Sequence, residues 1–165
     1  MRTSTNRLIA AVLLLLLATA CAQAGALNAA SSSFARGDFV VASRLLKPLA
    51  ERGNARAQAM LGFLYETGQG VPQAYGAASY WYRLAAEQGD TRAQYLLGLA
   101  YDKGHGVQQD VVAAYKWLDL AAAHAPRHMG DQFGRLRNAV ASKMTRDQIA
   151  AGQWYALRWP AESDF

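Results

Sequence analysis

The side chains of this chain that could bind a metal ion are few. The sequence holds three histidines and one cysteine in 165 residues. His124 and His128 are four positions apart, a spacing that would place both on one face of a helix, where they could share a metal ion. Pro126 lies between them and would interrupt such a helix, and no acidic residue or third histidine completes a ligand set. We therefore predict exposed loop histidines, no metal site and no cofactor.

The residue patterns of common catalytic centres are also missing. No recognisable motif surrounds a serine or cysteine nucleophile, and no pair of carboxylates stands apart from those expected at helix caps and on the surface. Gly68-x-Gly70 and Gly104-x-Gly106 suggest a phosphate-binding loop, but that motif needs a preceding strand and a following Gly-Lys-Ser/Thr. Tight turns explain both glycine pairs. We predict no catalytic residue; the alternative, a hydrolase-type enzyme, would depend on polar residues that the sequence does not identify.

Residues 1–24 have the composition of an export signal. Two arginines precede the apolar residues 8–20, and small residues follow. This run is too short for the roughly 20 residues that cross a bilayer. Cleavage after Ala24 would give a periplasmic or secreted protein. In the alternative, Cys21 ends an imperfect lipobox and carries a lipid that attaches the protein to the outer membrane.

The charge of the chain excludes a strongly basic partner-binding surface. The formal net charge is +5, and the signal holds two of the 17 basic residues and none of the 12 acidic ones. The remaining chain therefore carries 15 minus 12, or +3. Because its lysines and arginines are scattered singly rather than clustered, we expect no nucleic-acid partner.

A repeat of 36 residues organises the rest of the chain. Residues 57–92 and the 36 that follow are identical at 15 positions. The recurring positions include Ala57-Gln58, Leu61-Gly62, Tyr65, Gly68-x-Gly70-Val71, Trp81 and Leu84-Ala85-Ala86, each matched 36 residues later. Such a period is typical of arrays in which each unit is one supersecondary element that packs against the next.

Each unit predicts two antiparallel helices. Ala57, Leu61 and Tyr65 are spaced four apart and share one helix face, and the second half of the unit has a similar stripe of small and large residues. The glycine turns join the two helices, while Asn54 and Asp90 are suited to cap the first helix of each unit. We expect four repeated aromatic residues to lie in the core: Tyr65, Trp81, Tyr101 and Trp117.

The pattern Ala-Gln-x-x-Leu-Gly-x-x-Tyr-x-x-Gly-x-Gly-Val, followed by Ala-Ala-x-x-Trp and Leu-Ala-Ala, resembles the Sel-1-like repeat, a relative of the tetratricopeptide repeat. The resemblance implies an all-α fold, namely an α/α superhelix or right-handed solenoid of antiparallel helical hairpins. It also implies an adaptor or scaffold for protein complexes, here as an exported bacterial member of the family. The chain departs from the cysteine-rich branch of the family, so any penicillin-related activity of that branch is not carried over.

These observations divide the chain into segments. Residues 25–36 form an N-terminal helix or linker, and the repeats occupy 37–125, with a half repeat at 37–56 and full repeats at 57–92 and 93–125. Pro48 lies inside a helix expected from Phe39 to Arg52 and should bend it. Residues 126–165 form capping helices, one of which starts with a capping box at Thr145 and Gln148 and ends before Pro160. Five apolar residues are expected to cover the end of the array: Met144, Ile149, Trp154, Leu157 and Trp159.

The first helix of each unit also carries residues that could bind a partner. In arrays of this kind such helices line a concave groove, where Phe63, Tyr95 and Leu99 could hold an apolar side chain. Arg56 and Arg92 could meet acidic groups. The alternative is that these residues pack against neighbouring helices or lie on an ordinary surface. We predict a non-enzymatic scaffold or adaptor of the bacterial envelope that binds a protein or peptide as a monomer or weak dimer; a structural subunit that braces an envelope complex is the second possibility.

Overall fold

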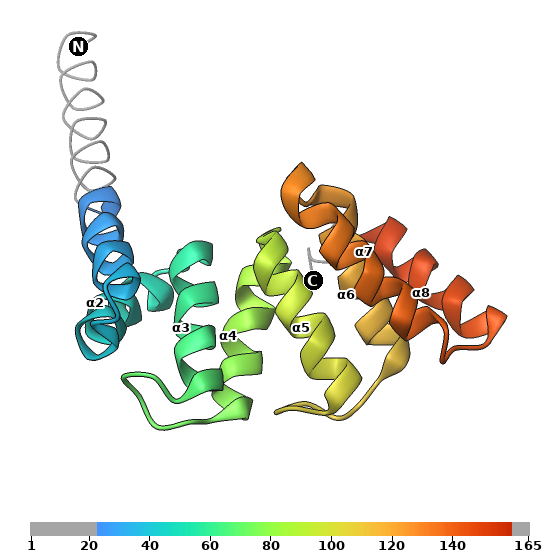
Figure 1. The fold of residues 1–165 in the computed structure, drawn as a ribbon, viewed down its shortest axis with the longest axis horizontal. Coiled ribbons are helices and arrows are strands. Elements are labelled where there is room, and N and C mark those ends of the chain that lie inside the picture. The colour runs from blue at the N-terminus through green and yellow to red at the C-terminus, as the bar shows by residue number, and fades with distance from the viewer. Residues whose placement is uncertain (1–22, 160–165) are drawn as a thin grey trace, which may run out of the picture.

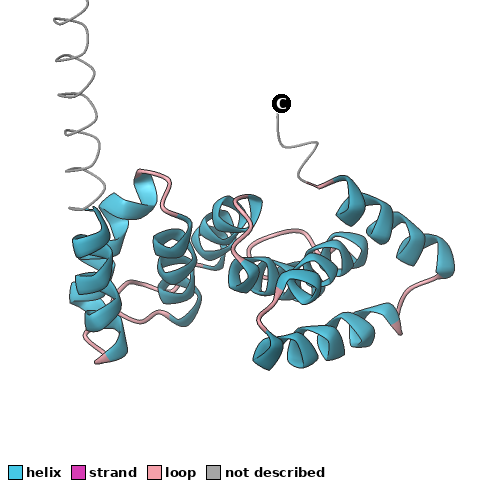
Figure 2. Cartoon of the chain, turned by 90° about the horizontal axis from the view of Figure 1, so that it is seen from above, coloured by secondary structure: helices cyan, strands magenta, loops and turns pink. Residues whose placement is uncertain are grey.

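The computed structural model describes residues 23–159, and these form helices and connecting turns without a strand (Figure 1). Helical residues 23–35 precede the numbered helices, which are α2 (Phe39–Glu51), α3 (Ala55–Thr67), α4 (Tyr75–Glu87), α5 (Thr91–Lys103), α6 (Val111–His124), α7 (Arg127–Ala141) and α8 (Arg146–Arg158). From α2 to α7 each helix packs against the next in sequence, whereas α8 packs against α6. The predicted all-α array of hairpins is confirmed, and Figure 2 shows the succession of hairpins from above.

The predicted caps set the ends of the first helix in each repeat. The side chains of Asn54 and Asp90 accept hydrogen bonds from backbone N–H groups three residues later, both at 2.9 Å. At the other end, Gly68 and Gly104 adopt left-handed conformations with φ of 70° and 71°. A glycine adopts this conformation without the steric cost that a Cβ would add, so it ends the helix and turns the chain.

Small residues let the two helices of a hairpin approach closely. A Cβ added at Gly62 would lie 2.7 Å from the ring of Tyr82, and one added at Gly98 would lie 2.7 Å from Leu118 Cγ. Both glycines are therefore required by the packing of α3 on α4 and of α5 on α6. This is the close approach that the repeated Leu-Gly pair indicates.

The turns of one hairpin contact the preceding hairpin. A Cβ at Gly70 would collide with the backbone of Phe39. The same contact recurs 36 residues later in both partners, where a Cβ at Gly106 would collide with the Tyr75 carbonyl. Ser79 Oγ donates a hydrogen bond to the Gly106 carbonyl at 3.0 Å, while Ser43 Oγ makes the equivalent bond to Gly70 at 3.4 Å. The repeat period therefore reappears as a repeated contact between hairpins.

Two buried glutamines join successive hairpins in the same way. Gln58 Nε2 donates to the Ala50 carbonyl at 3.0 Å, and Gln94 Nε2 donates to the Ala86 carbonyl at 3.2 Å. These carbonyls, at the ends of α2 and α4, also accept from Gly53 N and Gly89 N, so each glutamine adds a second hydrogen bond that joins the next helix to the end of the preceding one. The recurring Ala-Gln pair thus has a structural role.

The core only partly follows the predicted aromatic positions. Trp117 is buried, and Tyr65 and Tyr101 are half-buried between successive apolar clusters. Trp81 is likewise half-buried and packs against the cluster that contains Leu61, while the adjacent Tyr82 takes the fully buried position that faces Gly62. The large side chains that are most completely buried include Tyr82, Phe133, Leu46, Leu61, Leu64, Leu97 and Leu118.

The C-terminal segment forms the two predicted helices. The capping box at the start of α8 is confirmed, with Gln148 N donating to Thr145 Oγ1 at 3.3 Å and Thr145 N to Gln148 Oε1 at 2.9 Å. The predicted cover is wrong for two residues. Leu157 is 86% exposed and Trp154 48% exposed, because α6 is the one helix among residues 23–159 that packs closely on α8 and these two side chains lie outside that contact.

The other three predicted cover residues do pack inward. Met144 and Ile149 contact the cluster around Tyr115 and Leu118, and Trp159 contacts the cluster around Trp117. Pro48 lies inside α2 as expected, and that helix ends at Glu51. Pro160, the export signal apart from its last two residues, and Cys21 lie outside the described residues. Within residues 23–159, no helix is both long and apolar enough to span a bilayer.

Candidate peptide-binding groove

A groove of about 770 Å³ lies along one face of the array. Its lining comes from helical residues 23–35, α3, α5 and α7, with Asp90 at the start of α5, so every second helical segment contributes (Figure 1). Four of the five predicted binding residues line it: Arg56, Phe63, Arg92 and Tyr95. Leu99 lies one turn beyond Tyr95 on α5, half-buried and outside the lining. The structure therefore brings together four predicted residues and separates the fifth from them.

Aromatic rings form the two ends of the groove. The ring of Phe63 lies 5.7 Å from that of Phe34, between centroids, and so joins α3 to the preceding helix. The Tyr95 ring stacks on Phe133 of α7 at 4.3 Å, and Gln132 Nε2 donates a hydrogen bond to the Tyr95 hydroxyl at 3.4 Å. These contacts fix the two predicted aromatic residues in position, which lowers the entropy lost when a ligand binds.

Sequence reasoning missed several residues of this lining. Phe34 and Phe133 lie outside the two full repeats, so no internal comparison pointed to them. Met60 was detectable, because it corresponds to Leu96 in the next repeat and both line the groove. Met129 joins from the start of α7. Flexible thioether side chains adapt to ligands of different shape and are common at binding surfaces.

The groove also carries unpaired positive charge. Arg56 and Arg92 are each the second residue of a first helix and are 36 residues apart. Both are exposed, and neither forms a hydrogen bond or ion pair with another described residue. The acid in the lining is Asp90, whose Oδ1 accepts the hydrogen bond that caps α5. The guanidinium groups are therefore available to a ligand.

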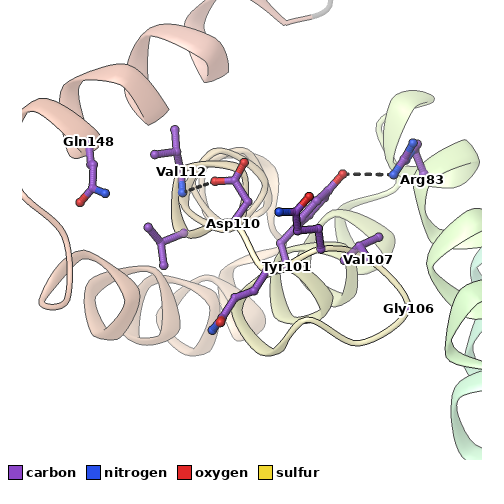
Figure 3. Close-up of a pocket in the computed structure, with 10 residues that line it drawn as sticks. Arg83, Tyr101, Gly106, Val107, Asp110, Val112 and Gln148 are labelled. Carbon is purple, nitrogen blue, oxygen red and sulfur yellow. Dashed lines mark hydrogen bonds between the residues drawn. The ribbon is translucent and has the colours of Figure 1, made fainter.

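A second, larger cavity of about 830 Å³ lies beside the turn between α5 and α6 (Figure 3). Arg83 Nη2 donates to the Tyr101 hydroxyl at 3.1 Å, and Asp110 Oδ1 accepts from Val112 N at 2.9 Å. The main charged groups that line this cavity are thus paired within the protein. We therefore take the groove along α3 and α5 as the candidate site.

The histidines do not form a site in the structure. His124 and His128 are exposed as predicted, but the predicted loop position is wrong for both: His124 is the last residue of α6 and His128 lies in the first turn of α7, because Pro126 separates two helices rather than interrupting one. The His105 ring lies against that of Tyr75, with 4.7 Å between the centroids and an angle of 34° between the ring planes. The described residues contain no group of three or more His, Cys, Asp or Glu side chains that could hold a metal ion.

One buried ionisable pair lies between α3 and α4. The Tyr82 hydroxyl donates to Glu66 Oε2 at 2.6 Å. Burial raises the pKa of Tyr82 well above its ordinary value, and the hydrogen bond to Glu66 raises it further. The hydroxyl therefore stays protonated and acts as a hydrogen-bond donor inside the hairpin.

The stacked helical hairpins and the groove along them together define a helical-repeat protein of the kind that binds other proteins.

Comparison with known proteins identifies the repeat. Residues 55–90 and 91–125 each match the model of the Sel1 repeat, and the matched segments begin with α3 and α5. The described part of the chain thus contains two Sel1 repeats, as the resemblance predicts. A search of curated proteins found no match.

Two solved structures share the fold. One is a protective antigen of uropathogenic Escherichia coli that displays an SLR fold, with a TM-score of 0.76 and 28% identity over 85% of this chain. The other is a Sel1 repeat protein from Oxalobacter formigenes, with a TM-score of 0.56 and 37% identity over 59% of this chain. This chain spans 30% and 39% of their lengths. Sel1 repeats generally mediate protein–protein interaction and are generally non-catalytic.

Proposed function

We propose that this protein is a non-enzymatic adaptor of the bacterial envelope that binds a segment of another protein in the groove along α3 and α5. One observation carries the proposal: the two Sel1 repeats place Phe63 and Tyr95 in a single lining with Phe34 and Phe133. Grooves of several hundred Å³ with an apolar lining and a few polar groups are the usual form of a ligand site.

The envelope location rests on the sequence of residues 1–24. Mass spectrometry of the protein purified from its native host tests it. A chain that starts at Gly25 would support export of a soluble product, and a chain that starts at an acylated Cys21 would support a lipoprotein. An intact chain that starts at Met1 and is recovered in the cytoplasm would contradict export in both forms.

A second candidate function is a structural subunit that braces a complex through α8. The observation that favours it is a cluster of exposed apolar residues on this helix, Trp154, Tyr155 and Leu157. Monomeric proteins rarely expose such clusters without a partner.

Site-specific photocrosslinking distinguishes the two functions. A photoreactive amino acid replaces Ala35 at the rim of the groove, Leu157 on α8, or Ala139, which is exposed on α7 outside the groove lining. A groove-binding adaptor gives a protein adduct from position 35 alone. An adduct from position 157 alone would favour the structural subunit, and equal adducts from position 139 would contradict both.

A further inference from the structure

The groove has a chemical character that narrows the class of its occupant. Its floor consists of aromatic rings and methionines, which are half-buried except for the buried Phe133, and Phe63 and Tyr95 belong to the aromatic pairs at its two ends. When one large apolar side chain of a ligand is buried against such a floor, the gain in binding free energy is roughly the free energy of transferring that side chain out of water. A ligand without an apolar side chain would leave this apolar surface exposed to water, and the surface would then contribute nothing to binding.

Charge supplies the second element of recognition. The guanidinium groups of Arg56 and Arg92 recur at the same position of consecutive repeats, at the same end of α3 and α5. No described acidic side chain pairs with either of them. Arginine is well suited to bind carboxylates because its planar guanidinium can donate two parallel hydrogen bonds.

Two charges beside an apolar floor are a weak basis for nucleic-acid binding. That binding draws most of its affinity from many phosphate contacts, which need a broad basic surface. The groove instead pairs a small positive edge with a large apolar floor, which is the division expected for a protein segment with acidic and apolar residues.

We infer that the groove binds a protein segment in which a large apolar side chain lies beside aspartate or glutamate residues. The inference rests on the proposed function and adds the chemistry of the partner. The apolar side chain packs among Phe63, Tyr95 and Met60, while the carboxylates meet Arg56 and Arg92. Acidic residues set the orientation of the segment, because the two arginines lie along one edge of the groove, at the N-terminal ends of α3 and α5.

Selection from random peptides displayed on phage tests the inference without assuming a partner. Purified protein should enrich peptides that contain both acidic and large apolar residues. The highest-ranking peptide is then labelled, and its affinity is measured by fluorescence anisotropy for the wild type and three variants. Arg56→Ala with Arg92→Ala removes the groove charges, and Arg44→Ala with Lys47→Ala makes the same charge change on exposed α2 positions outside the groove. Ala35→Trp fills the rim of the groove.

The expected result is a loss of about tenfold or more in affinity for the double-arginine variant and little change for the matched control. The loss should shrink at high salt, where exposed charges are screened. Enriched peptides without acidic residues, or equal affinity for both charge variants, would overturn the inference, as would tighter binding of a labelled single-stranded oligonucleotide than of the peptides. If Ala35→Trp still abolished binding in those cases, the groove function would survive. Unchanged binding by Ala35→Trp, or no enriched peptide, would contradict the proposed function itself.

Discussion

At the residue scale, two turn positions require glycine for different physical reasons. Gly53 and Gly106 both have positive φ, 86° and 71°. The space around a Cβ at Gly53 is open, whereas a Cβ at Gly106 would meet the backbone of Tyr75. The first position needs only a backbone conformation, and the second also needs the contact between hairpins.

Gly106→Ala and Gly53→Ala therefore form a matched pair. We expect Gly53→Ala to lower the free energy of unfolding by about 1–2 kcal/mol, the cost of a left-handed alanine. Gly106→Ala should cost clearly more, because a backbone carbonyl cannot move aside as a side chain can. Urea denaturation followed by circular dichroism measures both. Equal losses would show that the contact between hairpins adds nothing.

The Tyr82 hydroxyl gives a prediction about pH. Its pKa is raised in the folded chain, so the protonated form is stabilised by folding. This contribution is fully present below about pH 10, the ordinary tyrosine value, and is lost as pH rises above it, because only the unfolded chain releases the proton. Stability measured from pH 8 to 11 should fall more steeply for the wild type than for Tyr82→Phe. Parallel curves would contradict a raised pKa of the buried Tyr82 hydroxyl.

At the element scale, α8 closes the array with only part of its surface. Trp159 packs against the core at 6.3 Å from the Trp117 ring, between centroids, and Leu157 points to solvent. Two apolar residues close together in sequence thus have opposite roles, because Leu157 lies in the last turn of α8 whereas Trp159 is its C-cap, where the extended backbone leaves the helix.

Alanine substitutions separate these roles. Trp159→Ala should lower the free energy of unfolding by about 2–4 kcal/mol, less than the roughly 3–5 kcal/mol for a fully buried aromatic side chain because Trp159 is half-buried. Leu157→Ala should change it by less than about 0.5 kcal/mol. Thermal unfolding of the two variants beside the wild type measures the difference. A large loss from Leu157→Ala would show that α8 packs against a second copy or another segment.

At the scale of the whole molecule, stability should be graded along the array. In a repeat protein each unit contacts only its neighbours, so central units are supported on both sides and terminal ones on one side. Helices α4 and α5 have packed hairpins on both sides, while α8 and helical residues 23–35 lie at the ends of the described chain. The ends are therefore expected to open first.

Hydrogen–deuterium exchange followed by mass spectrometry tests this gradient. Peptides from α4 and α5 should exchange most slowly, and those from α8 most quickly among the numbered helices. A peptide bound in the groove should slow exchange in α3, α5 and α7 more than in α4. Uniform exchange along the chain would indicate a single cooperative unit instead of an array.

The sequence by itself determined the local parts of this protein. The 36-residue period, the caps at Asn54 and Asp90 and the glycine turns were predictable, because each depends on contacts within a few residues of the chain or on repetition of the same contact. The repeat also predicted that Arg56 lies beside Arg92, since equivalent positions in stacked units lie side by side. The same reasoning fails for Phe63 and its equivalent Leu99, because Leu99 lies outside the groove lining.

Only the tertiary structure decided what lies beyond the repeat. Phe34 and Phe133 are nearly 100 residues apart, and no period relates either of them to Phe63, so their meeting in one groove follows from how the hairpins stack. The exposure of Trp154 and Leu157 could not be predicted from the sequence either. An apolar residue in a terminal helix is compatible with either face, and which face is covered depends on the angle at which that helix packs on α6, a property of the assembled core rather than of the local sequence.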